Sequence, residues 1–363
     1  MKKISFITVH VGFNFGSILQ TIATFKILQD LGFSPMVVNY IPPRCTWKYY
    51  FSFSNLIRFF KNLIRFPIQL FNTHIYQSFL KKHVDLSCPI YSEDNFAEAC
   101  PRADIYLTGS DQVWNSKHNQ GLDKHYYFDG FPTAAKKIAY SSSIGRDSID
   151  ETEFFEVKRM LSSYHAISVR EANAKELIES MGYEAEHVLD PTFMLNREMW
   201  KSYMSKRLIK DKYLLVYAPY DVRNKDIVYK SAHQIAQQKH LKVVTFSWGL
   251  TSEKLADKTI IFANPGDFLS LMYYADYVIT TSFHGTAFSI NLNKQFSVYF
   301  PTGFSARIKS VLALCRLEDR ILEPNEILRT DKADVKINYI EVNSILNTER
   351  EKALRFLEKA LND

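Results

Sequence analysis

Residues 275–300 constrain the fold of this chain more than any other stretch of the sequence. A short apolar run at 277–279 predicts a buried parallel strand, and a polar turn follows at 280–285. Apolar residues at helical spacing then lead to a second strand at 296–300. In a β-α-β unit such a turn faces the ligand crevice, and the helix beginning there directs N–H groups toward an anion. His284, within this turn, is the strongest single candidate for chemistry, with a capping or packing role as the alternative.

The same alternation of strand and helix recurs along most of the chain. At 363 residues the chain is too long for one typical core, so two domains are expected. We predict an α/β fold with two Rossmann-like domains facing each other across a cleft. The predicted parts are a first domain at 1–195 with a helical insertion at about 44–90, a second domain at 212–325, and a tail with a helix packing back at 326–363.

Composition excludes several classes of protein. The content of 46% apolar and 23% charged residues is ordinary for a globular protein, and no run of about 18 apolar residues predicts a membrane span. The first strand stops too early for a signal peptide, and the four cysteines lack CxxC spacing, so we expect reduced thiols and a cytoplasmic protein. A net charge of +6 fits acidic small molecules or an anionic surface, and it is too small to predict nucleic-acid binding.

A basic, aromatic segment at about 48–82 interrupts the α/β pattern. Residues 56–65 are amphipathic at about 100° per residue, with Arg58, Lys61 and Arg65 on the face opposite the apolar side chains. One interpretation is a helix lying on the anionic inner face of a membrane, which would make the protein peripheral there. The other is a surface helix packed on the sheet with its basic face in water. Both interpretations require the same amphipathic pattern, so the sequence does not decide between them.

The first strand, near residues 4–9, is followed by a turn that contains glycine. These glycines do not match the dinucleotide-binding GxGxxG pattern, and no acidic residue ends the next strand at 35–40, so NAD binding is not expected. Asn14 and Ser17 remain as polar ligand contacts or as simple helix caps.

Two further strand ends carry candidate residues. The turn at 109–115 is rich in groups that bind sugars, namely Ser110, Asp111, Gln112 and Trp114. An acidic residue in a loop is often only a cap. Arg170 follows the strand at 165–169, where a guanidinium can grip a carboxylate or a phosphate. A surface ion pair with Glu171 or Glu176 is the alternative for Arg170.

Five motifs in order resemble the polysaccharide pyruvyl transferase family over nearly the whole chain. They are residues 14–20 (NFGSILQ), 109–114 (GSDQVW), 169–171 (VRE), 189–192 (LDPT) and 282–285 (SFHG). The resemblance implies a GT-B-like fold. It also implies transfer of the enolpyruvyl unit of phosphoenolpyruvate to a sugar, usually as a cyclic ketal, with release of phosphate.

The resemblance implies two roles, a general acid at His284 and a catalytic, donor-binding arginine at position 170, and the chemistry of the reaction adds Asp111 and Trp114. His284 would be the general acid, because an imidazolium is available near neutral pH, and Asp111 would be the base or would orient the acceptor hydroxyl. Trp114 would stack on the sugar. The acceptor set is Asn14, Ser17, Ser110, Asp111, Gln112 and Trp114, and the donor set is Arg170, Ser282, Phe283, His284, Gly285 and Arg307.

One position departs from the family pattern. Some members carry an arginine two residues before the histidine, where this chain has Ser282. Positive charge for the donor must then come from elsewhere, and Arg307 is the expected substitute beside Arg170.

The leading hypothesis is therefore a ketal pyruvyl transferase acting on a hexose, such as galactose, of a lipid-linked capsular or exopolysaccharide repeat. Phosphoenolpyruvate is a substrate in this scheme, and neither a cofactor nor a metal is required. The alternatives are a GT-B nucleotide-sugar glycosyltransferase, which a missing Glu after the His284 turn disfavours, and a glycan-binding protein with a degenerate site.

Overall fold

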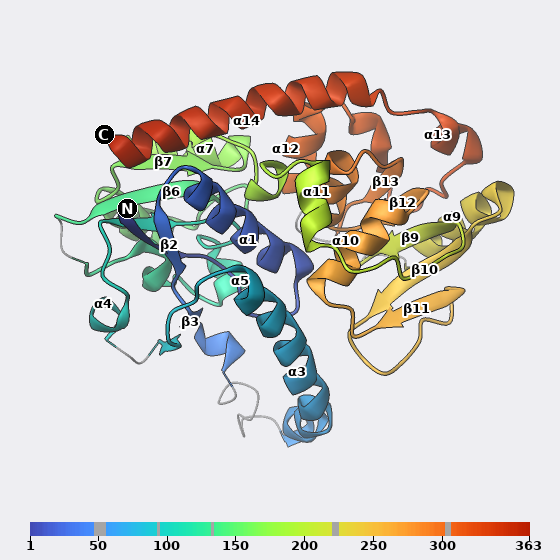
Figure 1. Ribbon diagram of the computed structural model, residues 1–363, viewed down its shortest axis with the longest axis horizontal. Helices are drawn as coiled ribbons and strands as arrows, with labels where there is room; N and C mark the ends of the chain where they lie inside the picture. Colours follow the sequence, from blue (N-terminus) through green and yellow to red (C-terminus); the bar gives the residue numbers. More distant parts are fainter. Residues whose placement is uncertain (47–55, 93–94, 132–133, 220–224, 302–305) are drawn as a thin grey trace. The chain divides into compact units, whose positions relative to one another are not determined.

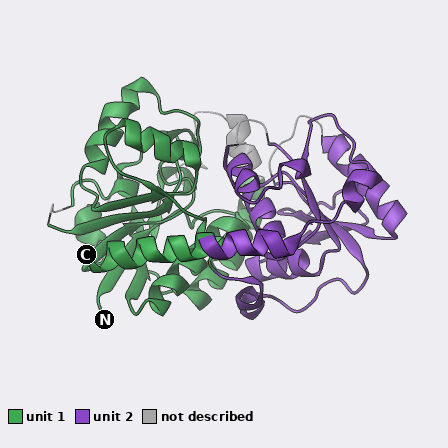
Figure 2. Ribbon diagram, turned by 90° about the horizontal axis from the view of Figure 1, so that it is seen from above, with its two compact units in different colours: residues 1–194, 349–363 green, residues 195–348 purple. Residues whose placement is uncertain are grey.

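The computed structural model describes residues 1–46, 56–92, 95–131, 134–219, 225–301 and 306–363. The chain divides into two compact units, unit 1 of residues 1–194 and 349–363 and unit 2 of residues 195–348 (Figure 2). Each unit is built around a parallel six-stranded sheet. The predicted α/β class with two Rossmann-like domains is confirmed, whereas a cleft between the domains stays a prediction.

The sheet of unit 1 has the strand order β2-β1-β5-β6-β7-β8, of which Figure 1 labels β2, β6 and β7. Its strands are β1 Lys3–Ile7, β2 Ser34–Val37, β5 Ile105–Thr108, β6 Lys136–Ser142, β7 Ala166–Val169 and β8 Glu186–His187. Its helices of eight residues or more, apart from α3 and α14, are α1 Phe15–Asp30, α6 Glu151–Leu161 and α7 Ala172–Ser180, and α4 Phe96–Ala99 and α5 Ser116–Asn119 are single turns. The strand order reverses between β1 and β5, and the carboxyl ends of strands beside such a switch point are where open α/β sheets bind ligands.

The strand predicted at residues 35–40 is divided in two. β2 ends at Val37, whose N–H donates to the carbonyl of Asp85 at 2.8 Å. The chain then pairs Tyr40–Ile41, as β3, with β4, Ile90–Tyr91. Pairing with the segment after the insertion therefore draws the end of the predicted strand away from the main sheet.

The insertion contains one long helix, α3, Leu56–His83, with Pro67 inside it. The predicted helix at 56–65 is only its first part, and residues 48–55 of the basic, aromatic segment lie outside the described residues. α3 packs beside α1 (Figure 1), where the rings of Phe15 and Tyr76 stack with centroids 5.3 Å apart. Among the described helices, none combines the length and the apolar composition that a membrane span needs.

The sheet of unit 2 has the order β11-β10-β9-β12-β13-β14, with its switch point between β9 and β12. Its strands are β9 Tyr213–Tyr217, β10 Lys242–Ser247, β11 Lys258–Ile261, β12 Tyr277–Thr280, β13 Phe296–Tyr299 and β14 Ile321–Leu322. Its helices are α8 Arg197–Trp200, α9 Lys225–Lys239, α10 Pro265–Tyr274, α11 Phe283–Asn291, α12 Ala306–Leu314 and α13 Thr330–Asp334. The central strands β9 and β12 are buried along their whole length, which explains their continuous apolar sequence.

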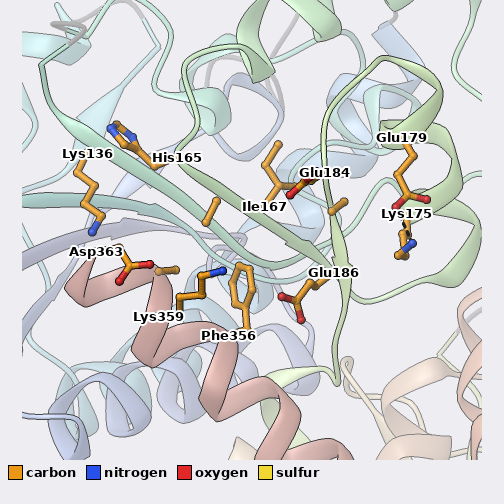
Figure 3. A pocket seen from close by; sticks show the side chains of 13 residues that line it. Lys136, His165, Ile167, Lys175, Glu179, Glu184, Glu186, Phe356, Lys359 and Asp363 are labelled. Carbon is orange, nitrogen blue, oxygen red and sulfur yellow. Dashed lines mark hydrogen bonds and ion pairs between the residues drawn. The ribbon is translucent and has the colours of Figure 1, made fainter.

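The last helix, α14, Tyr339–Asn362, starts among the residues of unit 2 and ends among those of unit 1. In unit 1, Arg350 donates from Nε to the carbonyl of Phe193 at 2.7 Å. Near the end of α14, Phe356 and Lys359 line a cavity of about 610 Å³ together with Glu186 of β8 (Figure 3). The end of α14 therefore packs near the edge of the sheet of unit 1.

Candidate active site

The turn that carries His284 joins β12 to α11 in unit 2, next to the switch point of that sheet. Ser282 is the N-cap of α11, with an extended backbone at φ −125°, and its hydroxyl accepts from Gly285 N at 3.4 Å. His284 is the second residue of the helix and is 2% exposed. An N-cap serine with its side chain turned onto the helix end is a common way to begin a helix, so local sequence places His284 in the first turn.

Gly285 is required by close packing at the same turn. A Cβ atom there would lie 2.1 Å from Oγ1 and 2.9 Å from Cβ of Thr280, and 2.9 Å from the ring of Tyr217. The hydroxyl of Thr280 donates to the carbonyl of Tyr217 at 2.7 Å and accepts from Ser282 N at 3.2 Å. The end of β9, the end of β12 and the start of α11 are thus held together around a residue with no side chain.

Tyr217, whose ring packs against the position of Gly285, also lines a cavity of about 290 Å³. It lies at the carboxyl ends of β9 and β10. Its wall combines aromatic rings and hydroxyls, and an ion pair between Lys225 and Glu253 stands at its margin. The described residues that line it include Tyr217, Tyr229, Thr245, Phe246, Ser247, Trp248, Thr251 and Ser252. Rings and hydroxyls of this kind suit a small polar ligand.

Arg307 lies close to the His284 turn. Its guanidinium carbon is 5.7 Å from the ring centroid of Phe283, whose ring lies 5.1 Å from that of His284 in an edge-to-face arrangement. Arg307 is 6% exposed. The structure thus brings together the five predicted donor residues of unit 2, and the expected cation is at the start of α12.

Arg170 occupies the centre of a buried ionic network in unit 1. Its side chain is fully buried, and each of its three nitrogens faces a carboxylate. Nη1 donates to Asp190 Oδ2 at 2.7 Å, Nη2 to Asp111 Oδ1 at 3.2 Å, and Nε to Glu171 Oε1 at 3.3 Å. Burial opposes the charge, but Asp190, Asp111 and Glu171 raise the pKa of Arg170 above its ordinary value.

This arrangement bears on the expected donor role of Arg170. Glu171 is one of three carboxylate partners of Arg170, as the alternative expected, but the ion pair is buried and does not lie on the surface. A donor anion would have to compete with three carboxylates for this buried guanidinium, and a displaced carboxylate would stay buried without its cation. Arg170 also belongs to unit 1, whereas the remaining donor candidates belong to unit 2.

Asp111 and Ser17 meet at the switch point of unit 1. Ser17, in the first turn of α1 after β1, donates its hydroxyl to Asp111 Oδ2, and Asp111 follows β5. The other oxygen of Asp111 also accepts from Gln112 N at 2.9 Å. The backbone of Asp111 is left-handed, with φ 68°, a conformation that residues other than Gly seldom adopt. The local backbone therefore turns this carboxylate toward both Ser17 and Arg170.

Four residues of this network are not among the predicted site residues: Ser143, Glu171, Asp190 and Thr192. Asp190 Oδ2 accepts from the hydroxyl of Ser110 at 3.1 Å, and its other oxygen accepts from N and Oγ1 of Thr192 at 2.9 and 2.7 Å. Glu171 accepts from the hydroxyl of Ser143. The sequence could have indicated three of them, because Ser143, Glu171 and Asp190 each follow a strand at the same edge of a parallel sheet.

The remaining acceptor candidates make local contacts. Asn14 is the N-cap of α1, accepting from Gly16 N at 2.9 Å, and Gln112 accepts from the side chain of Asn115 at 2.7 Å. Trp114 is a core residue, 3% exposed, whose indole stacks on Tyr127 with centroids 5.4 Å apart. The burial of Trp114 leaves its indole no open face for the predicted stacking on a sugar.

A family model described as polysaccharide pyruvyl transferase matches residues 14–299, most of the chain. The chain belongs to this family. The match includes every predicted site residue except Arg307. No curated protein matches the sequence.

Solved structures share the fold of this pyruvyl transferase family member. UDP-GlcNAc 2-epimerase from Neisseria meningitidis, solved with UDP-GlcNAc, has 11% identity and a TM-score of 0.52, with 99% of each chain covered. An Arabidopsis thaliana protein complexed with UDP-L-rhamnose has 7% identity and a TM-score of 0.54, covering 99% of this chain and 98% of that one. A glycosyltransferase from Rickettsia africae has 15% identity and a TM-score of 0.50, covering 100% and 99%. These likenesses confirm the predicted GT-B-like fold.

Proposed function

We propose that this family member transfers the enolpyruvyl group of phosphoenolpyruvate to a hexose, such as galactose, of a capsular or exopolysaccharide repeat. The product is a cyclic pyruvate ketal across two hydroxyls, and phosphate is released. The observation that carries the proposal is His284 in the first turn of α11, at the switch point of its sheet, in a chain that matches the family over residues 14–299.

The chemistry needs one acid and one base. His284 protonates C3 of the enol, which makes C2 electrophilic, and an acceptor hydroxyl attacks C2 while losing its proton to Asp111. The bond from C2 to the phosphate oxygen then breaks, and a second hydroxyl closes the ring. One hydroxyl proton is balanced by the proton gained at C3, and the other leaves with phosphate.

The donor is a multiply charged anion, and we place it in unit 2. The N-terminal turn of α11 directs N–H groups toward the carboxyl edge of the sheet, and Arg307 supplies a cation near Phe283. The cavity beside Tyr217 offers room next to this turn. Arg307 thus takes the place of the arginine that some members carry at the position of Ser282.

Turnover assays with phosphoenolpyruvate and a galactoside test the proposal. We expect phosphate release and an acceptor heavier by the mass of pyruvic acid less water. His284→Ala should lower turnover by about 100-fold or more, because a general acid contributes at least this much. His233→Ala removes an exposed histidine of α9 in the same unit and serves as the matched control. Wild-type protein that releases no phosphate with any acceptor of the host glycan would refute the function.

A lipid-linked acceptor would explain the insertion. Leu63, Leu70 and Phe71 of α3 are each about half exposed, a surface that suits an interfacial helix. We therefore propose peripheral contact with anionic lipid through residues 48–82. The protein should sediment with phosphatidylglycerol vesicles and not with phosphatidylcholine vesicles, and Arg58→Glu with Lys61→Glu should abolish sedimentation. Equal recovery from both kinds of vesicle would contradict the contact.

A nucleotide-sugar glycosyltransferase is the second candidate, favoured by the rings and hydroxyls around the cavity beside Tyr217. Thermal-shift measurements with UDP-sugars, GDP-sugars and phosphoenolpyruvate separate the two functions. Stabilisation by phosphoenolpyruvate alone supports the pyruvyl transferase, and stabilisation by a nucleotide sugar alone supports the alternative.

A further inference from the structure

The Arg170 network contains more acidic groups than the proposed chemistry uses. Asp111, Glu171 and Asp190 all contact one guanidinium, and their side chains are between 1% and 5% exposed. Only Asp111 has a role in the chemistry. Asp190 and Glu171 contact Arg170 from the two sides that Asp111 leaves open.

The geometry of a guanidinium makes this arrangement rigid. Its N–H groups lie in one plane at fixed angles, so two carboxylates that hold Nη1 and Nε also fix the direction of Nη2. Nη2 is the nitrogen that donates to Asp111. Asp190 is itself fixed, because Thr192 and Ser110 donate to its oxygens.

We propose that Asp190 and Glu171 are positioning residues, which hold Arg170 so that it orients the carboxylate of Asp111 toward the acceptor hydroxyl. The inference rests on the proposed function, because Asp111 needs orienting only if it accepts that proton. It gives Arg170 a role in the reaction without contact with the donor.

The charge of the network sets the proton affinity of Asp111. Arg170 lowers the affinity, whereas Asp190 and Glu171 raise it through like charge. Titratable groups near the network include Tyr140 and His187. Burial and the nearby Asp190 raise the pKa of Tyr140, and His187 Nε2 contacts the carbonyl of Arg170 at 3.2 Å.

The test uses variants that change charge or geometry separately. Arg170→Lys keeps the charge but loses the planar fork, so kcat should fall about 100-fold, as misplacement of a reacting group commonly does. The acidic limb of the pH–rate profile should then move to higher pH. Asp190→Asn keeps the shape but removes a negative charge, so kcat should fall about tenfold and the limb should move to lower pH. In both variants KM for phosphoenolpyruvate should remain that of the wild type.

Arg159 provides the matched control. Its guanidinium bridges Asp129 and Glu156 on the surface of the same unit, at 2.8 and 2.9 Å. Arg159→Lys and Asp129→Asn should change neither kcat nor the profile. Far-ultraviolet circular dichroism checks folding, and Glu171→Gln, which is isosteric, replaces Arg170→Lys if the latter fails to fold.

Two results would overturn the positioning role while leaving the proposed function in place. A large rise in KM for phosphoenolpyruvate in Arg170→Lys would place this side chain at the donor. Unchanged kcat and pH limbs in Asp190→Asn and Glu171→Gln would make the network purely structural. Wild-type protein without phosphate release would remove both the proposed function and this inference.

Discussion

Lys294 lies beyond α11, directly after Asn293, whose backbone is left-handed at φ 57°. Its ammonium donates to the carbonyl of Tyr273 at 2.7 Å. Burial lowers the pKa of Lys294 to about 8, and the charge of Arg197 acts in the same direction. Below about pH 8 the folded protein therefore holds this charge in a buried place, which destabilises the folded state.

The lowered pKa predicts a pH-dependent stability. Between about pH 8 and the ordinary lysine value near 10.4, the unfolded chain binds more protons than the folded one, so this group makes stability rise with pH. Below pH 8 its unfavourable effect is fully present. Lys294→Met should therefore gain stability relative to wild type at pH 7, and the gain should shrink toward pH 10. Urea unfolding at pH 7, 8, 9 and 10 measures the difference. Lys230→Met, an exposed change in α9, is the control, and a pH-independent difference for Lys294→Met would contradict the prediction.

The turn between β12 and α11 depends on Gly285, which has no side chain. Thr280, against which a Cβ of Gly285 would press, is completely buried and is hydrogen-bonded to the end of β9. The neighbouring strand ends cannot yield without breaking those bonds.

Gly285→Ala should destabilise the protein by about 1–3 kcal/mol, because added volume in a packed site forces its neighbours to shift. The midpoint of chemical unfolding measures this cost. Gly249→Ala is the matched control, since a Cβ at Gly249 meets nothing within 4 Å. Equal midpoints for the two variants would show that the turn relaxes more readily than the packing indicates.

Local sequence determined some elements well and others poorly. The sequence predicts a helix at 265–274, and α10 has these bounds, because Asn264 and Asp267 form a capping box around Pro265. The sequence also predicts a strand at 187–191, whereas β8 is Glu186–His187, because Asp190 bonds Thr192 and turns the chain. The full length of α3 was missed because Pro67 predicts a break that the observed helix tolerates.

For the whole molecule, α14 is the element that both units share. Its residues from 349 onward belong to unit 1, where Leu357 and Leu361 are completely buried. At its start, Ile340 is 87% exposed. Val342 and Leu346 are buried, so Ile340 marks the exposed face of this part of the helix.

Leu357→Ala should cost about 2–5 kcal/mol of stability, the range for a large apolar side chain removed from a core. Ile340→Ala, in the same helix, should cost far less. Guanidinium unfolding of both variants checks this contrast. A similar loss in the two variants would mean that the end of α14 contributes little to unit 1.

Sequence placed the candidate residues at the right edges of the sheets but could not pair them. Asp111, Arg170 and Asp190 each follow a strand, so a shared sheet edge was predictable from the alternation alone. Which carboxylate contacts the guanidinium depends on side-chain packing between segments 20 and 59 residues apart. The same limit applies to Trp114, whose partner Tyr127 lies beyond the motif that singled it out.

The excess of carboxylates around Arg170 helps to keep the anionic donor and the neutral acceptor in separate places. Three acidic side chains against one guanidinium give the switch point of unit 1 a field that repels phosphate and carboxylate and tolerates neutral hydroxyls. The corresponding place in unit 2 offers a helix N-terminus and Arg307. We expect this field to keep phosphoenolpyruvate out of the acceptor position. Phosphoenolpyruvate at high concentration should therefore compete only weakly with the acceptor. This inhibition should become stronger in Asp190→Asn, which removes one negative charge.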